Sequence, residues 1–187
     1  MPRAPSIRPV QPGDDLARLT DLIHAAYAPQ AARGLRYWGT HQSVEDTAKR
    51  LASGHGLLAE LDGEYVGTIT ARPPQADSPV AIYRDRQTWT ISQFAVAPPS
   101  KGRGLGKALH EAAVRHALRN GATMMALDTA APAQDLIAMY TAWGYQPVGE
   151  HSWQPLTNYV SVVMRRSLVH PGTLSSTSAD PGHAADA

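Results

Sequence analysis

The amino-acid sequence predicts one mixed α/β domain over residues 1–168, and three observations support this fold class. Segments with the composition of β-strands alternate along the chain with segments whose apolar residues recur at helical spacing. The chain has 187 residues, which is enough to bury one good core without a second domain. A glycine-rich run at residues 101–107 joins an extended segment to a helix.

The N-terminal elements are a short strand at residues 7–10 and a helix that Asp14 or Asp15 can cap. Residues 28–42 look irregular, and Ser43 begins a second helix with acidic residues in its first turn. The apolar face of the first helix is formed by Leu16, Leu19, Leu22, Ile23 and Ala26.

A β-hairpin follows the second helix. Residues 56–61 and 64–71 are its strands, and they flank Asp62 and Gly63, which tolerate the positive φ angles of a tight turn. Residues 72–87 are rich in Pro, Asp and Arg, and they are expected to form a long loop that can border a binding cleft.

The C-terminal half continues the alternation of strands and helices. A strand at residues 88–96 ends before Pro98, because proline cannot donate to a ladder. From Val169 the composition becomes polar and rich in Pro and Gly, so residues 169–187 are expected to be a disordered C-terminal tail. The elements between are a helix from Leu105, a strand at 122–129, a helix around Tyr140 that Gly144 can end, and strands at 146–150 and 159–165.

The glycine-rich run is the most informative motif. Its glycines fall in the first turn of a helix, where backbone N–H groups have no partner within the helix and the helix dipole adds positive charge. A glycine has no side chain to keep a phosphate away from those N–H groups. The geometry predicts an anion site suited to a pyrophosphate, although a glycine turn that merely joins strand to helix is the alternative.

Two common phosphate-binding loops do not fit this run. A P-loop needs glycine where Lys101 stands, and Ser or Thr where Ala108 follows Lys107. A dinucleotide-binding fingerprint needs a third glycine where Lys107 or Leu109 stands.

Three motifs together resemble the GNAT superfamily of acyl-CoA-dependent N-acetyltransferases over roughly residues 6–167. The run at 101–106 is similar to the family's pyrophosphate loop, with Lys101 in place of its usual Gln or Arg. Residues 94–98, Phe-Ala-Val-Ala-Pro, are similar to the strand end that pairs with pantetheine. Residues 138–145 look like the helix that carries the family's tyrosine, here Tyr140, before Gly144.

The resemblance implies a GNAT-like fold: a mixed, mostly antiparallel central sheet flanked by helices, with the fourth and fifth strands splayed around the acyl-CoA. It implies that Tyr140 is the catalytic acid that holds or protonates the CoA thiolate, although Tyr140 could instead be an aromatic packed on Trp143. It implies no metal and no covalent enzyme intermediate. The residues expected to bind acetyl-CoA, the cosubstrate, are Phe94, Ala95, Val96, Lys101, Gly102, Arg103, Gly104, Leu105, Gly106 and Lys107.

The general base is left open, because the glutamate that many relatives carry on the fourth strand is absent. A water relay through Thr90 or Ser92 could serve, as could Asp128, Glu150 or His151. The asparagine that is frequent seven residues before the family's tyrosine is Ala133 in this chain.

The expected reaction is transfer of an acetyl group to a primary amine, most simply of a small molecule. The alternatives are acetylation of a protein N-terminus or lysine, and a non-catalytic acyl-CoA-binding module. Cationic and aromatic residues suited to a carboxylate or a planar group could line an acceptor pocket or pack as a surface loop. These residues are Arg33, Arg36, Tyr37, Trp38 and His41.

Composition narrows the possible partners. With 17 basic and 16 acidic residues the net charge is +1, which indicates no nucleic-acid partner and no membrane surface. The chain has no cysteine, and its eight histidines are scattered without metal-ligand spacing, so no metal site is expected. No apolar run approaches the roughly 18 residues of a membrane span, and no signal peptide is recognisable, which predicts a cytoplasmic protein. The resemblance also suggests a possible homodimer.

Overall fold

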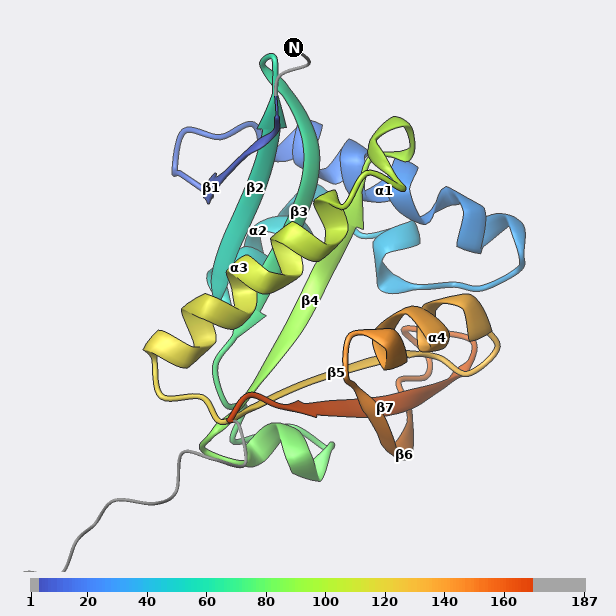
Figure 1. Ribbon diagram of the computed structural model, residues 1–187. Helices are drawn as coiled ribbons and strands as arrows, with labels where there is room; N and C mark the ends of the chain where they lie inside the picture. The colour runs from blue at the N-terminus through green and yellow to red at the C-terminus, as the bar shows by residue number, and fades with distance from the viewer. Residues whose placement is uncertain (1–3, 170–187) are drawn as a thin grey trace, which may run out of the picture.

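A seven-stranded sheet runs through the computed structural model, which describes residues 4–169 (Figure 1). The strand order in the sheet is β1-β2-β3-β4-β5-β7-β6. Nearly all of the expected tail at 169–187 lies outside the described residues. The strands are β1 (Ser6–Pro9), β2 (His55–Leu61), β3 (Glu64–Arg72), β4 (Thr88–Val96), β5 (Met124–Ala130), β6 (Gln146–Ser152) and β7 (Val160–Ser167).

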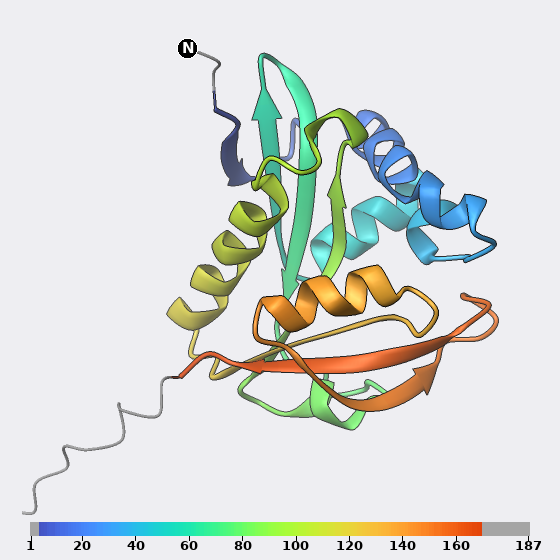
Figure 2. The ribbon, with the colours of Figure 1, turned by 45° about the vertical axis from the view of Figure 1, so that its right-hand side comes forward.

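Neighbouring strands of the sheet are antiparallel except for β4 and β5, which are parallel. Residues 88–90 of β4 pair with residues 124–126 of β5, and the ladder ends there. Beyond Thr90, β4 stays paired with β3, whereas β5 stays paired with β7. The two halves of the sheet therefore diverge like the arms of a V (Figure 2), as the predicted splaying of the fourth and fifth strands requires.

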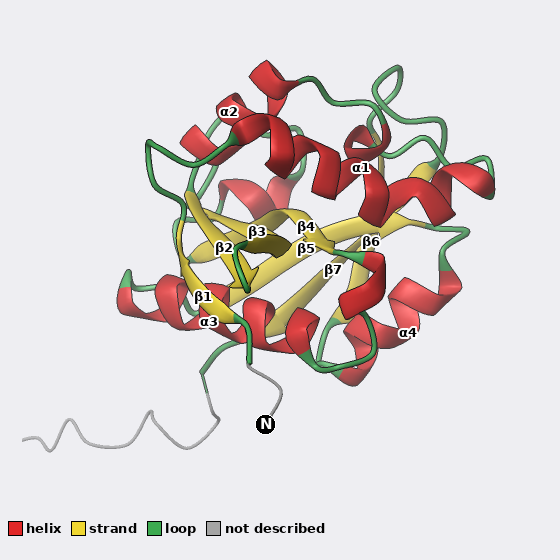
Figure 3. Ribbon diagram, turned by 90° about the horizontal axis from the view of Figure 1, so that it is seen from above, coloured by secondary structure: helices red, strands yellow, loops and turns green. Residues whose placement is uncertain are grey.

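Helices cover both faces of the sheet (Figure 3). On one face lie α1 (Leu16–Ala32) and α2 (Val44–Ala52), and on the other lie α3 (Leu105–Arg119) and α4 (Gln134–Ala142). The largest core cluster packs α3 and α4 on the sheet, and a second cluster packs α1 on it. Among residues 4–169, no helix has the length and apolarity needed to cross a membrane.

Several local expectations are confirmed by the backbone and its caps. The Asp15 carboxylate accepts hydrogen bonds from two N–H groups in the first turn of α1. Ser43 caps α2 in a reciprocal capping box with Asp46. The hairpin turn has φ angles of 51° at Asp62 and 81° at Gly63, so both residues adopt the conformation that this tight turn demands.

The expectation of irregular structure from residue 28 is wrong, because α1 continues through Pro29 to Ala32. Proline removes one backbone donor from a helix, and here the loss falls in the final turns. In the same region the Lys101 Nζ donates to the Ala26 carbonyl oxygen over 3.1 Å. This hydrogen bond joins α1 to the glycine-rich run.

Candidate functional site

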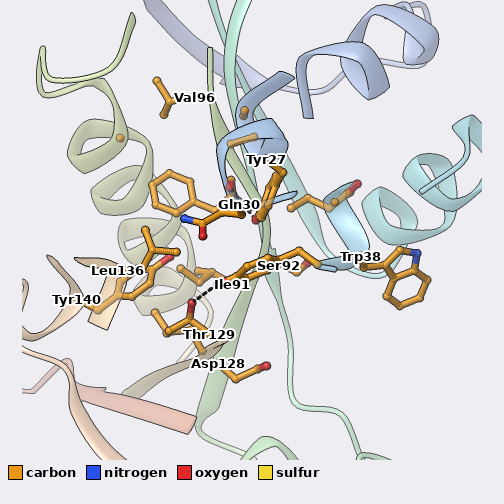
Figure 4. Close-up of a pocket in the computed structure, with 18 of the residues that line it drawn as sticks. Tyr27, Gln30, Trp38, Ile91, Ser92, Val96, Asp128, Thr129, Leu136 and Tyr140 are labelled. Atoms are coloured by element: carbon orange, nitrogen blue, oxygen red, sulfur yellow. Dashed lines mark hydrogen bonds between the residues drawn. The ribbon is translucent and has the colours of Figure 1, made fainter. Parts of the chain in front are cut away.

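A cleft of about 900 Å³ opens where β4 and β5 diverge (Figure 4). Its walls come from α1, the outer half of β4, the glycine-rich run, the end of β5 and α4. Figure 4 shows Ile91 and Ser92 of β4 between Tyr27 and Gln30 of α1 and Thr129 of β5. Nine of the eleven residues predicted for the site line this one cleft: Phe94, Ala95, Val96, Lys101, Gly102, Gly104, Gly106, Lys107 and Tyr140.

The glycine-rich run forms one end of the cleft. Gly102 and Gly104 have φ angles of 74° and 80°, and a Cβ built on either would meet no other atom within 4 Å. The first bond of α3 joins the Ala108 N–H to the Gly104 carbonyl, so the N–H groups of residues 105–107 have no partner inside the helix. This geometry fits a pyrophosphate, because bare N–H groups and open space coincide.

Arg103 and Leu105 are the two predicted residues that do not line the cleft. The Leu105 side chain is buried in the core under α3, so its only group available to a ligand is its backbone N–H. Arg103 is exposed. The side chains between the glycines therefore point away from the cleft, Arg103 to the surface and Leu105 into the core. The spacing of the glycines alone does not specify these directions.

The outer half of β4 presents one unpaired edge to the cleft. Ala95 and Val96 pair with Thr68 and Gly67 of β3, while the ladder to β5 has already ended at Thr90. An extended ligand could add to this edge as a further strand would, through main-chain hydrogen bonds. The geometry therefore suits the predicted pantetheine contact.

A β-bulge shapes the same strand at Gln93, and the sequence analysis did not foresee it. Thr68 and Thr70 of β3 face Ala95 and Ser92, so β4 holds one extra residue between them, and Gln93 has a φ angle of 49°. The buried Gln93 Oε1 accepts a hydrogen bond of 2.7 Å from the Gln42 Nε2.

The network around Gln93 reaches the helices on that face of the sheet. The Gln42 Nε2 also donates to the Thr47 hydroxyl over 2.7 Å, and the Arg50 Nη1 donates to the Gln42 Oε1 over 2.6 Å. Gln93 lies 51 positions from Gln42 in the sequence, so no local pattern could have predicted their meeting. Their effect is to hold the bulge in a single conformation.

Tyr140 reaches into the cleft from α4 (Figure 4). Only 8% of the residue is exposed, and burial raises the pKa of its hydroxyl well above the ordinary value. No group among residues 4–169 hydrogen-bonds to this hydroxyl. The ring also packs edge-on against Trp143, with centroids 5.8 Å apart, so the aromatic contact of the alternative interpretation is present as well.

The candidates for the general base separate into two groups. Thr90, Ser92 and Asp128 line the cleft, whereas Glu150 and His151 lie on β6 and do not. The Asp128 carboxylate accepts two hydrogen bonds from neighbouring side chains. Its Oδ1 accepts from the Tyr83 hydroxyl over 2.8 Å. Its Oδ2 accepts from the Trp153 Nε1 over 2.9 Å. Both donors are neutral, so they orient the carboxylate without forming an ion pair with it.

The cationic and aromatic residues predicted for an acceptor pocket divide in the same way. Arg33, Tyr37 and Trp38 line the cleft, and Arg36 and His41 do not. The Arg36 Nη1 instead donates to the Pro155 carbonyl oxygen over 3.0 Å. Three further cations in the cleft, Lys49, Arg50 and Arg72, were missed, because nothing in their local sequence marks them.

A metal centre finds no support in the part of the chain that the structure describes. Residues 4–169 contain no group of three or more His, Asp or Glu side chains placed to hold an ion. The Asp128 carboxylate in the cleft is held by the protein donors of Tyr83 and Trp153.

Comparison with known proteins assigns this chain to a protein family. Residues 18–145 match the Acetyltransferase (GNAT) family, and this chain belongs to that family. It is 30% identical over 133 residues to N-acetyltransferase 8 of Mus musculus, a match that covers 70% of this chain and 55% of the mouse protein. The chain thus spans about half the length of that relative.

Solved structures share the fold. The ribosomal-protein-S18-alanine N-acetyltransferase of Escherichia coli superposes with a TM-score of 0.68 at 16% identity, over 92% of this chain and 99% of that one. A GNAT family acetyltransferase from Elizabethkingia anophelis, solved with acetyl-CoA bound, superposes with a TM-score of 0.63 at 17% identity. That match covers 88% of this chain and 98% of the other. The predicted fold class and family are thereby confirmed.

Proposed function

We propose that this protein transfers an acetyl group from acetyl-CoA to a primary amine of a small molecule. The observation that carries the proposal is the convergence of three features in one cleft: a free strand edge, bare N–H groups at the start of α3, and the Tyr140 hydroxyl, which has no hydrogen-bond partner among residues 4–169. The membership of the GNAT family supports the same function.

The residues of the cleft fit acetyl-CoA along its length. The N–H groups of Gly106 and Lys107 would hold the pyrophosphate, with the amines of Lys101 and Lys107 beside it. The free edge of residues 94–96 would bind the pantetheine. Bound acetyl-CoA supplies the carbonyl that the amine attacks and the thiolate that departs.

The protein's own groups would assist at three points. Backbone N–H groups at the bulge beside Phe94 are fixed by the Gln93 network and can donate to a developing oxyanion without reorganising. Asp128 can hold the acceptor's ammonium group and take its proton. The Tyr140 hydroxyl can donate to the departing CoA thiolate, because burial raises the pKa of the phenol and keeps it protonated. Burial also raises the pKa of the CoA thiol, which favours its protonation.

Two other functions remain as alternatives. A protein N-terminus or lysine could be the acceptor, as the name of the E. coli structural neighbour states for that enzyme. A non-catalytic acyl-CoA-binding module is suggested by the missing strand glutamate and by Ala133. A cytoplasmic location and a homodimer stay predictions.

Release of free CoA thiol, followed with a panel of small primary amines, tests the proposed function. Release that depends on the amine supports a small-molecule N-acetyltransferase. Release with peptides alone would favour a protein acceptor. Saturable binding of acetyl-CoA without release for any amine or peptide would favour the binding module.

A further inference from the structure

Two arginines line the end of the cleft that lies away from the glycine-rich run. Arg72, the last residue of β3, is the register partner of Thr90. Thr90 marks the point where the β4–β5 ladder ends, six residues before Val96, which leads to the glycine-rich run. Arg50 reaches the cleft from the last turn of α2. Both charges therefore lie where an acceptor would bind if acetyl-CoA occupies the other end.

Neither arginine has an acidic partner among residues 4–169. The Arg72 side chain makes no hydrogen bond with any described residue, and its Nε is buried. Arg50 donates to Gln42 and stacks on the Trp38 ring, with its guanidinium carbon 5.0 Å from the ring centroid. Two guanidinium groups are thus held in a partly desolvated cleft without an ion pair to any described carboxylate.

The desolvation of these two guanidinium groups costs free energy, which an anionic ligand could offset. Burial lowers the pKa of Arg72. Burial also lowers the pKa of Arg50, with a smaller contribution from the nearby Arg72 charge and against the opposing effects of Tyr27, Asp46 and Asp128. A desolvated cation without an anionic partner is unfavourable, and arginine stays charged rather than losing its proton. The planar fork of a guanidinium matches the two oxygens of a carboxylate.

The neighbouring carboxylate, Asp128, forms no ion pair with either arginine. Asp128 is two residues beyond Ala126, the register partner of Thr90, and so it lies on the same face of the sheet as Thr90 and Arg72. It accepts its hydrogen bonds from Tyr83 and Trp153. The cleft therefore offers separate sites for an anion and for a cation.

We propose that the acceptor is an amine that also carries a carboxylate, as an α-amino acid does, and that Arg72 and Arg50 bind this carboxylate while Asp128 holds the ammonium group. The inference rests on the proposed function and specifies its substrate class. It disfavours a protein N-terminus, which has no free carboxylate next to its amine.

Equilibrium binding tests the inference without turnover. With CoA present, N-acetylglycine, N-acetyl-L-leucine and N-acetyl-L-phenylalanine are titrated calorimetrically and compared with their amides. At least one acid should bind about tenfold or more tightly than its amide. The Arg72→Gln variant should reduce that preference to about twofold or less, and Arg86→Gln, at an exposed arginine outside the cleft, should retain it. Equal affinities for every acid and amide pair, or an unchanged preference in Arg72→Gln, would overturn the proposal.

Thermal unfolding separates ligand binding from a structural role for Arg72. Because the Arg72 side chain has no hydrogen-bond partner in the described protein, Arg72→Gln should melt at or above the wild-type temperature. A marked loss of stability would mean that the arginine supports the fold, which would contradict the inference.

Activity distinguishes failure of the inference from failure of the proposed function. The inference predicts a kcat/KM for leucine that falls at least about tenfold in Arg72→Gln, with leucinamide changed little. If the protein binds acetyl-CoA and acetylates neutral amines while leucine and leucinamide respond alike, the substrate class is wrong and the function stands. If acetyl-CoA does not bind, the proposed function itself fails.

Discussion

The Tyr27 hydroxyl donates a hydrogen bond to the carbonyl oxygen of Phe94 over 3.1 Å. Through this contact α1 holds β4 just after the bulge, at the edge proposed to bind pantetheine. Burial raises the pKa of Tyr27 to about 12, so the phenol remains a donor over the whole neutral range. The contact joins residues separated by 67 positions in the chain.

Replacing Tyr27 with Phe should therefore affect both stability and binding. The lost hydrogen bond should cost about 1 kcal/mol in the free energy of unfolding, measured with urea. Acetyl-CoA affinity should fall severalfold, because the Phe94 carbonyl loses its fixed orientation. Tyr65→Phe is the control: it removes a half-buried tyrosine hydroxyl that contacts Asp14 and the Asp15 N–H outside the cleft, and it should leave that affinity unchanged. Similar affinities for all three proteins would show that the Tyr27 contact is only structural.

The Gly104→Val substitution tests the pyrophosphate site. A valine at a φ angle of 80° is strained, and its side chain would fill the space that a phosphate needs. Gly121→Val is the matched control, because Gly121 has a φ angle of 83° and open space around it but lies outside the cleft. Both variants should lose stability, while only Gly104→Val should weaken acetyl-CoA binding by about tenfold or more. Unchanged affinity in Gly104→Val would refute the site.

Local rules predicted those parts of the fold that depend on neighbours in the sequence. The Asp62-Gly63 turn and the Ser43 cap depend on residues within a few positions of each other. Pro29 misled the prediction, because one missing N–H near the end of a 17-residue helix costs less than the packing of α1 gains.

The candidate site was predictable only where a motif is continuous. The glycine-rich run and residues 94–96 are single stretches of sequence, and they do line the cleft. The Gln93 bulge depends on Gln42, and the acceptor end depends on a register that puts Arg72 and Asp128 on one face across three strands. Such meetings follow from the tertiary fold and leave no local signature.

Tyr140→Phe should lower turnover by roughly 100-fold or more with little change in acetyl-CoA affinity, if the hydroxyl is the acid. The variant should be as stable as the wild type, because the hydroxyl has no partner among residues 4–169. Tyr145→Phe is the matched control, because the Tyr145 hydroxyl is hydrogen-bonded to the His110 Nε2 over 2.8 Å. That variant should lose about 1 kcal/mol of stability and keep its turnover. Full activity in Tyr140→Phe would make Tyr140 structural.

His110 predicts how stability changes in acid. Its side chain is fully buried, and burial lowers its pKa from 6.5 to about 4, against the opposing effect of Glu111 and with a smaller contribution from Arg166. Between these values the unfolded chain binds a proton that the folded protein does not, so the stability present above pH 6.5 is lost as the pH falls toward 4. Urea unfolding across this range should show a decline that is shallower in His110→Gln by up to about 1.4 kcal/mol per pH unit. Parallel pH profiles would contradict this assignment, and the pKa values of His55 and His116, also lowered by burial, would then account for the decline.

The most direct test of the account is calorimetric titration of the protein with acetyl-CoA, compared with CoA and with ATP. The account predicts saturable binding of acetyl-CoA and of CoA, because the strand edge and the glycine-rich run contact parts that both share, and no comparable binding of ATP, which lacks pantetheine. Failure of the folded protein to bind acetyl-CoA would mean that the glycine-rich run is structural, and it would contradict the acetyltransferase function.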